Sequence, residues 1–188
     1  MNFLRLTLTL VISCAISQLF ATDFESNFTK EVNRPWIGKE YWTNPMMNWR
    51  LKEGEAQVFF SKEGGVHDIH HLTHQLKPDE GSFTQKVRLS LENIDGKNLK
   101  KAGFKFGIIG SIPEEYRSNL FRSQGLMAGI DSEGHLFIPG MVSKKSIELA
   151  QLKDIFLVLK VAHQGSTLDL NLAAYEGGSM GCLLYTSD

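Results

Sequence analysis

The chain of 188 residues has few cysteines, few prolines and little net charge. Its two cysteines are Cys14 and Cys182, its prolines number five, and its formal net charge is −1 at pH 7. Both cysteines lie in terminal segments that we expect to be outside the mature domain, so the domain has no disulfide framework and no thiolate metal site. Because no block of lysine or arginine is present, nucleic acid is not expected as a partner.

Recognised catalytic motifs are also missing. The sequence has no G-x-S-x-G, no H-E-x-x-H, no glycine-rich phosphate loop and no cysteine–histidine pair. The E-x-D-x-x-E carboxylate set of jelly-roll glucanases is absent, since Glu92 and Asp95 have the wrong spacing and Asp131 and Glu133 fit a hairpin tip. The sequence therefore predicts no catalytic, cofactor-binding or metal-ligating residue in this chain.

The N-terminus has the pattern of an export signal. Arg5 precedes an apolar run over residues 6–16, which is shorter than the roughly 20 residues that span a bilayer. We expect a signal peptide over residues 1–21, ending near Ala21, and no transmembrane segment. Two alternatives stay open: lipidation of Cys14, which ends a V-I-S-C box, and a buried N-terminal element. The first would give an exported, lipid-anchored protein; without lipidation the chain is periplasmic, outer-surface or extracellular.

Residues 22–34 are polar and predict a linker, and residues 35–180 predict one β domain. Apolar residues alternate between glycine-rich turns, which is typical of short strands. We predict strands within 49–60 on both sides of Gly54, and over 66–76, 81–91, 102–109, 155–162 and 168–175. Residues 126–138 predict a hairpin that turns at Gly134, residues 112–123 one short helix after Pro113, and residues 142–154 a mixed polar segment.

This spacing predicts an all-β fold, an antiparallel two-sheet sandwich or jelly roll with one short helix. Residues of one parity along each strand should form its core. The predicted core residues are Phe83, Val87, Leu89, Phe104, Phe106, Ile108, Leu157, Leu159, Leu168, Leu170 and Leu172.

Four histidines, His67, His70, His71 and His74, lie close together in the sequence. On a helix, their i,i+4 spacing would give two metal-competent pairs. On a strand, His67 and His71 would share a face about 13 Å apart at roughly 3.3 Å per residue, which is too far for one ion. The surrounding pattern favours a strand without metal, although imidazoles can still respond to pH near 6.5.

Four aromatic residues, Trp36, Tyr41, Trp42 and Trp49, precede the first predicted strands. Such rings can stack on sugar, but rings beside strands more often fill a core or a sheet edge. We favour the core interpretation and keep sugar binding as the alternative.

The C-terminal residues 181–188 do not continue the strand pattern. The string C-L-L-Y-T-S-D resembles a translated sequencing adapter, so we expect a non-native tail and a gene that continues past about Met180. A genuine C-terminal strand is the alternative.

Longer motifs resemble a known family. The run W-I-G-K-E-Y-W-T-N-P over residues 36–45 and the run G-L-M-A-G-I-D-S-E-G-H-L-F-I over residues 125–138 resemble the N-terminal region of bacterial alkaline phosphatase D-like metallophosphatases. In that family an exported concanavalin A-like sandwich precedes a metallophosphatase domain, which holds the divalent metals. No ligand residue can be carried over, because the family's ligands lie in that later domain.

The resemblance implies a non-catalytic accessory module whose partner is its own downstream catalytic domain. The alternative is a lectin-like carbohydrate-binding module of a polysaccharide-acting or cell-surface protein, with a surface glycan as partner. No cofactor is expected in this chain under either hypothesis.

Overall fold

The chain is described by a computed structural model, in which strands account for most of the described residues. Helical residues in that part are confined to two three-residue 3-10 turns, η1 (Met46–Asn48) and η2 (Gln151–Lys153). The prediction of an all-β fold is therefore confirmed. The structure describes residues 24–26, 28, 32–58, 65–74, 81–90, 101–107, 125–148, 150–164, 167–177 and 183–186.

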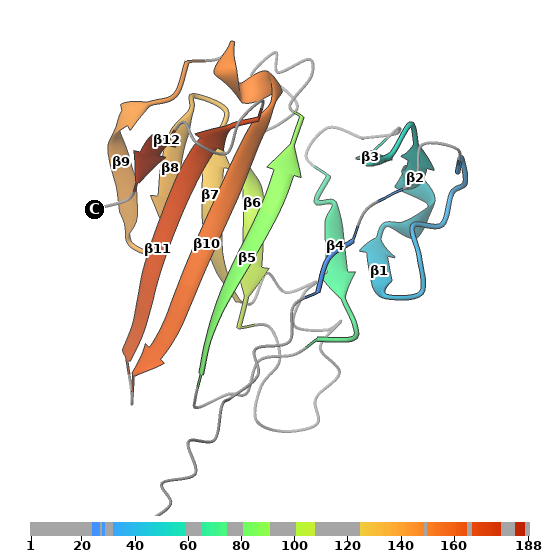
Figure 1. Ribbon diagram of the computed structural model, residues 1–188, viewed down its shortest axis with the longest axis horizontal. Coiled ribbons are helices and arrows are strands. Elements are labelled where there is room, and N and C mark those ends of the chain that lie inside the picture. The colour runs from blue at the N-terminus through green and yellow to red at the C-terminus, as the bar shows by residue number, and fades with distance from the viewer. Residues whose placement is uncertain are drawn as a thin grey trace, which may run out of the picture.

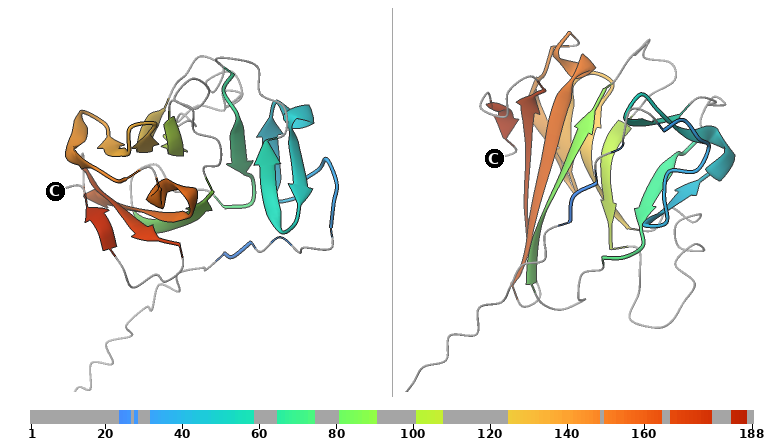
Figure 2. Two further views of the ribbon diagram at one scale, coloured as in Figure 1. Left: turned by 90° about the horizontal axis from the view of Figure 1, so that it is seen from above. Right: turned by 45° about the vertical axis from the view of Figure 1, so that its right-hand side comes forward.

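Two antiparallel four-stranded sheets face each other (Figures 1 and 2). The first has the order β12-β11-β10-β5, and the second has the order β6-β7-β8-β9. Because β6 to β9 follow one another within a single sheet, the strand order confirms a two-sheet sandwich but not a jelly roll. The strands are β5 (Gly81–Leu89), β6 (Lys101–Phe106), β7 (Leu126–Asp131), β8 (His135–Ile138), β9 (Met141–Ser146), β10 (Ile155–Gln164), β11 (Thr167–Glu176) and β12 (Leu183–Thr186).

The remaining strands form a separate region, which we call the N-terminal unit (described residues from 24 to 74). It contains two small antiparallel sheets, β1-β4 and β2-β3. Figures 1 and 2 show this unit beside the sandwich, next to β5 and β6. The strands are β1 (Tyr41–Asn44), β2 (Trp49–Lys52), β3 (Glu55–Val58) and β4 (Asp68–His71).

Local turn chemistry explains the hairpins that the sequence predicted. Gly54 has a φ of 84° between β2 and β3, and Gly134 has a φ of 87° between β7 and β8, conformations that glycine adopts at little cost. The Asp131 carboxylate accepts hydrogen bonds from the backbone N–H groups of Glu133 and His135, each at 2.9 Å. Both predicted hairpins are therefore confirmed.

The sandwich core lies between the sheets and draws on both. Its buried residues are Phe104, Ala128, Ile130, Leu136, Ile147, Leu152, Ile155, Leu157, Leu159, Val161, Leu172 and Ala174. Four predicted core residues belong to this set: Phe104, Leu157, Leu159 and Leu172. Five more are partly buried against it: Phe83, Val87, Leu89, Phe106 and Leu170.

One predicted core residue is exposed. Leu168 is 44% exposed, so its assignment to the core was wrong. It has the correct parity but lies at the start of β11, paired with His163 near the turn, where the hairpin ends extend past the second sheet (Figure 1). The position of a residue in the alternation decides on which face of the strand its side chain lies. Its burial also requires that the opposing sheet extends that far along the strand.

Several boundaries differ from the sequence prediction. Residues 41–44 form a strand that was not predicted, and the segment predicted as mixed and polar contains most of β9. Of the strand predicted over 66–76, the structure describes residues 66–74, in which only Asp68–His71 are strand. β12 pairs with β11 within the segment expected to be a non-native tail. Ile108, the predicted helix at 112–123 and the predicted signal peptide lie outside the described residues.

The second sheet contains two facing glycines, Gly103 on β6 and Gly129 on β7. A Cβ atom on Gly103 would overlap the backbone of Ala128, and one on Gly129 would overlap the backbone of Ala102. Phe137 pairs with Gly129 from the other side and is only 8% exposed, although it lies outside the core cluster. Gly129 alternates with the core residues Ala128 and Ile130, so Phe137 lies beside it on the outer face, where an aromatic ring can cover the area that glycines leave open.

Leu172 and Leu168 offer a matched test of the core, because they share one strand and one parity. We expect Leu172→Ala to lower the free energy of unfolding by about 2–5 kcal/mol, since it opens a cavity between the sheets. Leu168→Ala should lower it by less than about 1 kcal/mol. Urea unfolding followed by circular dichroism would measure both values, and equal losses would contradict the described core.

Candidate functional site

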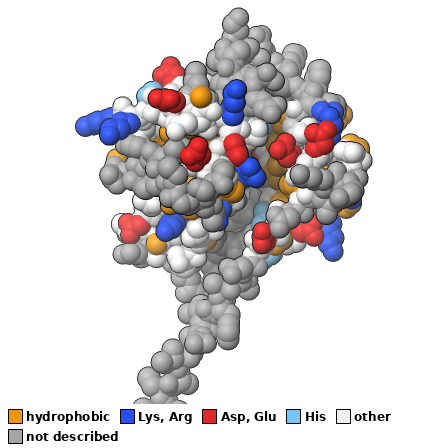
Figure 3. All heavy atoms as spheres, turned by 45° about the horizontal axis from the view of Figure 1, so that its top comes forward, with side chains coloured by type: hydrophobic (Ala, Val, Ile, Leu, Met, Phe, Trp, Pro, Cys, Tyr) orange, Lys and Arg blue, Asp and Glu red, His pale blue; other side chains and the backbone are white. Residues whose placement is uncertain are grey.

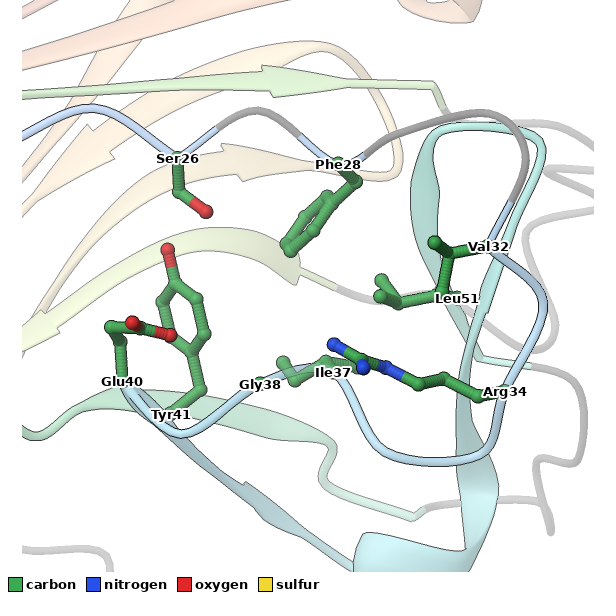
Figure 4. A pocket seen from close by; sticks show the side chains of 9 residues that line it. All are labelled: Ser26, Phe28, Val32, Arg34, Ile37, Gly38, Glu40, Tyr41 and Leu51. Atoms are coloured by element: carbon green, nitrogen blue, oxygen red, sulfur yellow. The ribbon is translucent and has the colours of Figure 1, made fainter.

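The N-terminal unit has a small hollow on its surface, with a volume of about 180 Å³. Its apolar wall includes Ile37 and Leu51, which belong to the small core of this unit together with Trp49. Figure 4 shows the side chains around the hollow. The nine lining residues are Ser26, Phe28, Val32, Arg34, Ile37, Gly38, Glu40, Tyr41 and Leu51.

Backbone contacts hold the walls of the hollow. Arg34 and Leu51 exchange two backbone hydrogen bonds of 3.2 and 2.7 Å, which attach the segment before β1 to β2. The Tyr41 N–H donates to the Gly38 carbonyl at 3.3 Å and closes the turn into β1. Gly38 has a φ of 145°, a conformation that favours glycine.

Four polar side chains surround the hollow: Ser26, Arg34, Glu40 and Tyr41. Figure 4 shows Ser26, Glu40 and Tyr41 at one side and the Arg34 guanidinium at the other. Arg34 Nε donates to the Trp36 carbonyl at 2.7 Å, and its guanidinium lies 5.1 Å from the Trp36 ring centre. Among the described residues, the Arg34 terminal amino groups, the Glu40 carboxylate and the Tyr41 and Ser26 hydroxyls make no hydrogen bond or ion pair with another side chain.

A cluster of rings lies next to the hollow, where β1 pairs with β4. The rings of His71 and His74 stack at 4.8 Å between centres, and Phe24 contacts them at 4.1 and 4.8 Å. Tyr41, which also lines the hollow, stacks on His71 at 5.6 Å. Thr73 Oγ1 lies 3.0 Å from His71 Nε2 and 3.0 Å from His74 Nδ1, within hydrogen-bond distance of both.

The contact between His71 and His74 differs from the arrangement expected for a regular strand. Regular alternation would place His67 with His71 and His70 with His74, but β4 ends at His71 and the chain bends. The bend brings His71 against His74, whereas His67 lies 3.0 Å from Asn48 Nδ2. Within the described part of the chain, no group of three histidine, cysteine, aspartate or glutamate side chains is placed to hold a metal ion.

The four aromatic residues that were candidates for sugar stacking do not form one surface. Trp49 is buried in the small core, and Trp42 lies against the His70 ring at 5.0 Å. Trp36 is 49% exposed beneath Arg34, and Tyr41 alone lines the hollow. The core interpretation therefore applies to Trp49 and not to Trp36.

Sequence reasoning did not identify the hollow. Ser26, Phe28, Val32 and Arg34 lie in the segment predicted to be a linker, yet they line it. The available signal was the pair of opposite charges, Arg34 and Glu40, on either side of the aromatic run. Nothing in the spacing of these residues showed that Leu51 would bridge to Arg34 and close the wall.

Burial shifts two of the histidines. Desolvation lowers the pKa of His70 below its ordinary value of 6.5. The charge of Asp68 raises this pKa, and the charge of Lys105 on β6 lowers it further. Desolvation likewise lowers the pKa of His71, helped by His74 and opposed by Glu40. Both shifts favour the neutral imidazole over the charged one.

Comparisons with protein-family models, curated proteins and solved structures give no match for this chain. Within the residues that the structure describes, no helix is long and apolar enough to cross a membrane.

The two lowered pKa values predict a loss of stability in acid. The unfolded chain takes up protons near pH 6.5, whereas folded His70 and His71 resist protonation, so protonation favours unfolding as the pH falls below 6.5. We expect the double variant His70→Gln/His71→Gln to lose less Tm than the wild type between pH 7.5 and pH 5. Thermal melts at both pH values would measure the loss of Tm. If the variant and the wild type lose the same Tm, these imidazoles are not responsible for the acid sensitivity.

Proposed function

We propose that the chain is a non-catalytic N-terminal accessory module of an exported alkaline phosphatase D-like metallophosphatase. The motifs over residues 36–45 and 125–138 support this parentage. The two-sheet architecture is compatible with the concanavalin A-like domain that the resemblance implies. In this proposal the divalent metals and the phosphoester chemistry belong to the catalytic domain.

The observation that carries the accessory role is the distribution of exposed apolar side chains. Eight exposed large hydrophobic residues lie in the N-terminal unit, and five lie in the larger described part of the sandwich. Figure 3 shows hydrophobic side chains at the surface on the side of the N-terminal unit, interspersed with charged groups. The eight are Phe24, Trp36, Met46, Met47, Val58, Val66, Ile69 and Leu72.

Such a distribution suits contact with another protein domain. Scattered exposed hydrophobic residues are ordinary, but a concentration of them rimmed by charges marks an interaction surface. Met47, at 77% exposure, extends from η1 and is the most exposed of these residues. We therefore assign the N-terminal unit as the face that packs on the catalytic domain and orients it.

Carbohydrate binding through the four aromatic rings is a weaker alternative. A sugar platform needs rings that are exposed and face one ligand, but Trp49 is buried and Trp42 packs on His70. These four residues do not meet that requirement together.

The absence of activity in the isolated chain is the first test. We expect residues 22–180 to hydrolyse neither an aryl phosphate monoester nor a diester when zinc, calcium, manganese or iron is added, because two-metal hydrolysis needs ligands that hold ions roughly 4 Å apart. The same assays are run on the wild type and on the variants His70→Ala and His71→Ala. Metal-dependent turnover that either substitution abolishes would overturn the accessory role and make the histidines an active site.

The docking face is tested with charge substitutions. With the downstream region of the parent gene expressed as a separate domain, Met47→Asp should weaken association about tenfold or more, because a buried carboxylate would lack a partner. Leu168→Asp, on an exposed position of the sandwich, is the matched control and should leave the Kd unchanged. Isothermal titration calorimetry measures both, and finding a glycoside hydrolase or a stop codon downstream would refute the parentage.

A further inference from the structure

We propose that the hollow of the N-terminal unit binds a single neutral saccharide ring. This inference does not depend on the parentage proposed above, because it rests only on the side chains around the hollow. It also uses other residues than the four aromatic candidates, with Tyr41 alone in common.

The two opposite charges beside the hollow, on Arg34 and Glu40, indicate which class of ligand can bind there. Arg34 offers hydrogen-bond donors at one side and Glu40 offers acceptors at the other (Figure 4). An anionic ligand would pair with Arg34 but be repelled by Glu40, and a cationic ligand would meet the reverse. A hydroxyl group both donates and accepts, so a neutral ring with hydroxyls on its perimeter satisfies both sides.

The unused hydrogen-bonding capacity points the same way. The Tyr41 and Ser26 hydroxyls add two groups that can each donate and accept. Arg34 Nε is already used by the Trp36 carbonyl at 2.7 Å, which fixes the orientation of the guanidinium. The terminal amino groups are thereby pre-oriented without being consumed, which lowers the entropy cost of binding.

The walls and the size of the hollow fit one ring. Phe28 and Tyr41 line the hollow as a tilted pair of rings in contact with each other, with centres 6.2 Å apart and planes inclined at 56°, and Ile37 and Leu51 form an apolar wall. The C–H faces of a pyranose can pack on such surfaces while its hydroxyls reach the polar groups. A volume of about 180 Å³ is below the roughly 300–1,000 Å³ of sites for drug-sized ligands, so we infer a monosaccharide or the terminal unit of a glycan.

The binding test is an NMR titration of the purified chain with the methyl glycosides of glucose, galactose and mannose. We expect saturable shifts for at least one of them, with a Kd on the order of 1 mM, confined to signals of the N-terminal unit. Glucuronate, glucosamine and free leucine serve as anionic, cationic and zwitterionic comparisons and should bind at least tenfold more weakly.

Two variants assign the site. Glu40→Gln should weaken binding about tenfold or more, because a hydrogen bond to a charged acceptor is lost, and Tyr41→Phe should weaken it about three- to tenfold. The matched controls are Glu148→Gln and Tyr175→Phe, both on the sandwich, which should bind as the wild type does. If Glu40→Gln fails to fold, as judged by its amide spectrum, Tyr41→Phe alone decides the assignment.

Each outcome of these titrations either supports or overturns the saccharide proposal. Neutral-sugar binding that is lost in the hollow variants and kept in the controls supports the inference. Tighter binding of glucuronate, glucosamine or leucine than of any neutral sugar overturns it, as does sugar binding that the hollow variants leave unchanged. The absence of binding by all three glycosides up to 50-fold above the expected Kd, roughly 50 mM, overturns it as well.

Discussion

Apolar packing between the two four-stranded sheets is the interaction on which the rest of the structure depends. Alternate side chains of β10 and β11 point inward and meet those of β6, β7 and β8, so the central residues Leu157, Leu159 and Leu172 are completely removed from water. At about 25 cal/mol per Å² of apolar surface, this burial is the main term that can offset the entropy of ordering the chain. The small core around Ile37, Trp49 and Leu51 is separate and much smaller.

That difference between the two cores shapes where a function can reside. The sandwich is closed by its own packing, whereas the N-terminal unit has short strands, a hollow and a concentration of exposed apolar residues. Regions with few buried contacts commonly provide binding surfaces, because their side chains are not all committed to a core. Both proposals, a docking face and a saccharide site, accordingly concern this unit and leave the sandwich as a scaffold.

The sequence predicted the strands with the clearest alternation and missed features that depend on distant contacts. Phe104, Leu157 and Leu172 follow from parity alone, and Gly54 and Gly134 follow from turn chemistry. Leu168 failed because parity carries no information about where the opposing sheet ends. The hollow was missed for a related reason, since Arg34 and Leu51 are brought together by a backbone bridge that no local pattern encodes. The strand at Asp68–His71 lies within the predicted strand, but the contact between His71 and His74 was not predicted, because the chain bends after His71 and leaves the strand geometry.

The facing glycines of the second sheet set a criterion for recognising relatives of this chain. Since a side chain on Gly103 or Gly129 would overlap the backbone of the neighbouring strand, neither position can change alone without moving β6 away from β7. Phe137 is the cross-strand neighbour of Gly129 and is almost fully buried, so we expect an aromatic ring at this position to accompany the same pair. We therefore expect distant homologues to keep glycine at positions 103 and 129 and an aromatic residue at position 137, even where the surrounding sequence has diverged. A three-position signature of this kind can identify members of the fold when overall sequence identity is too low to align them.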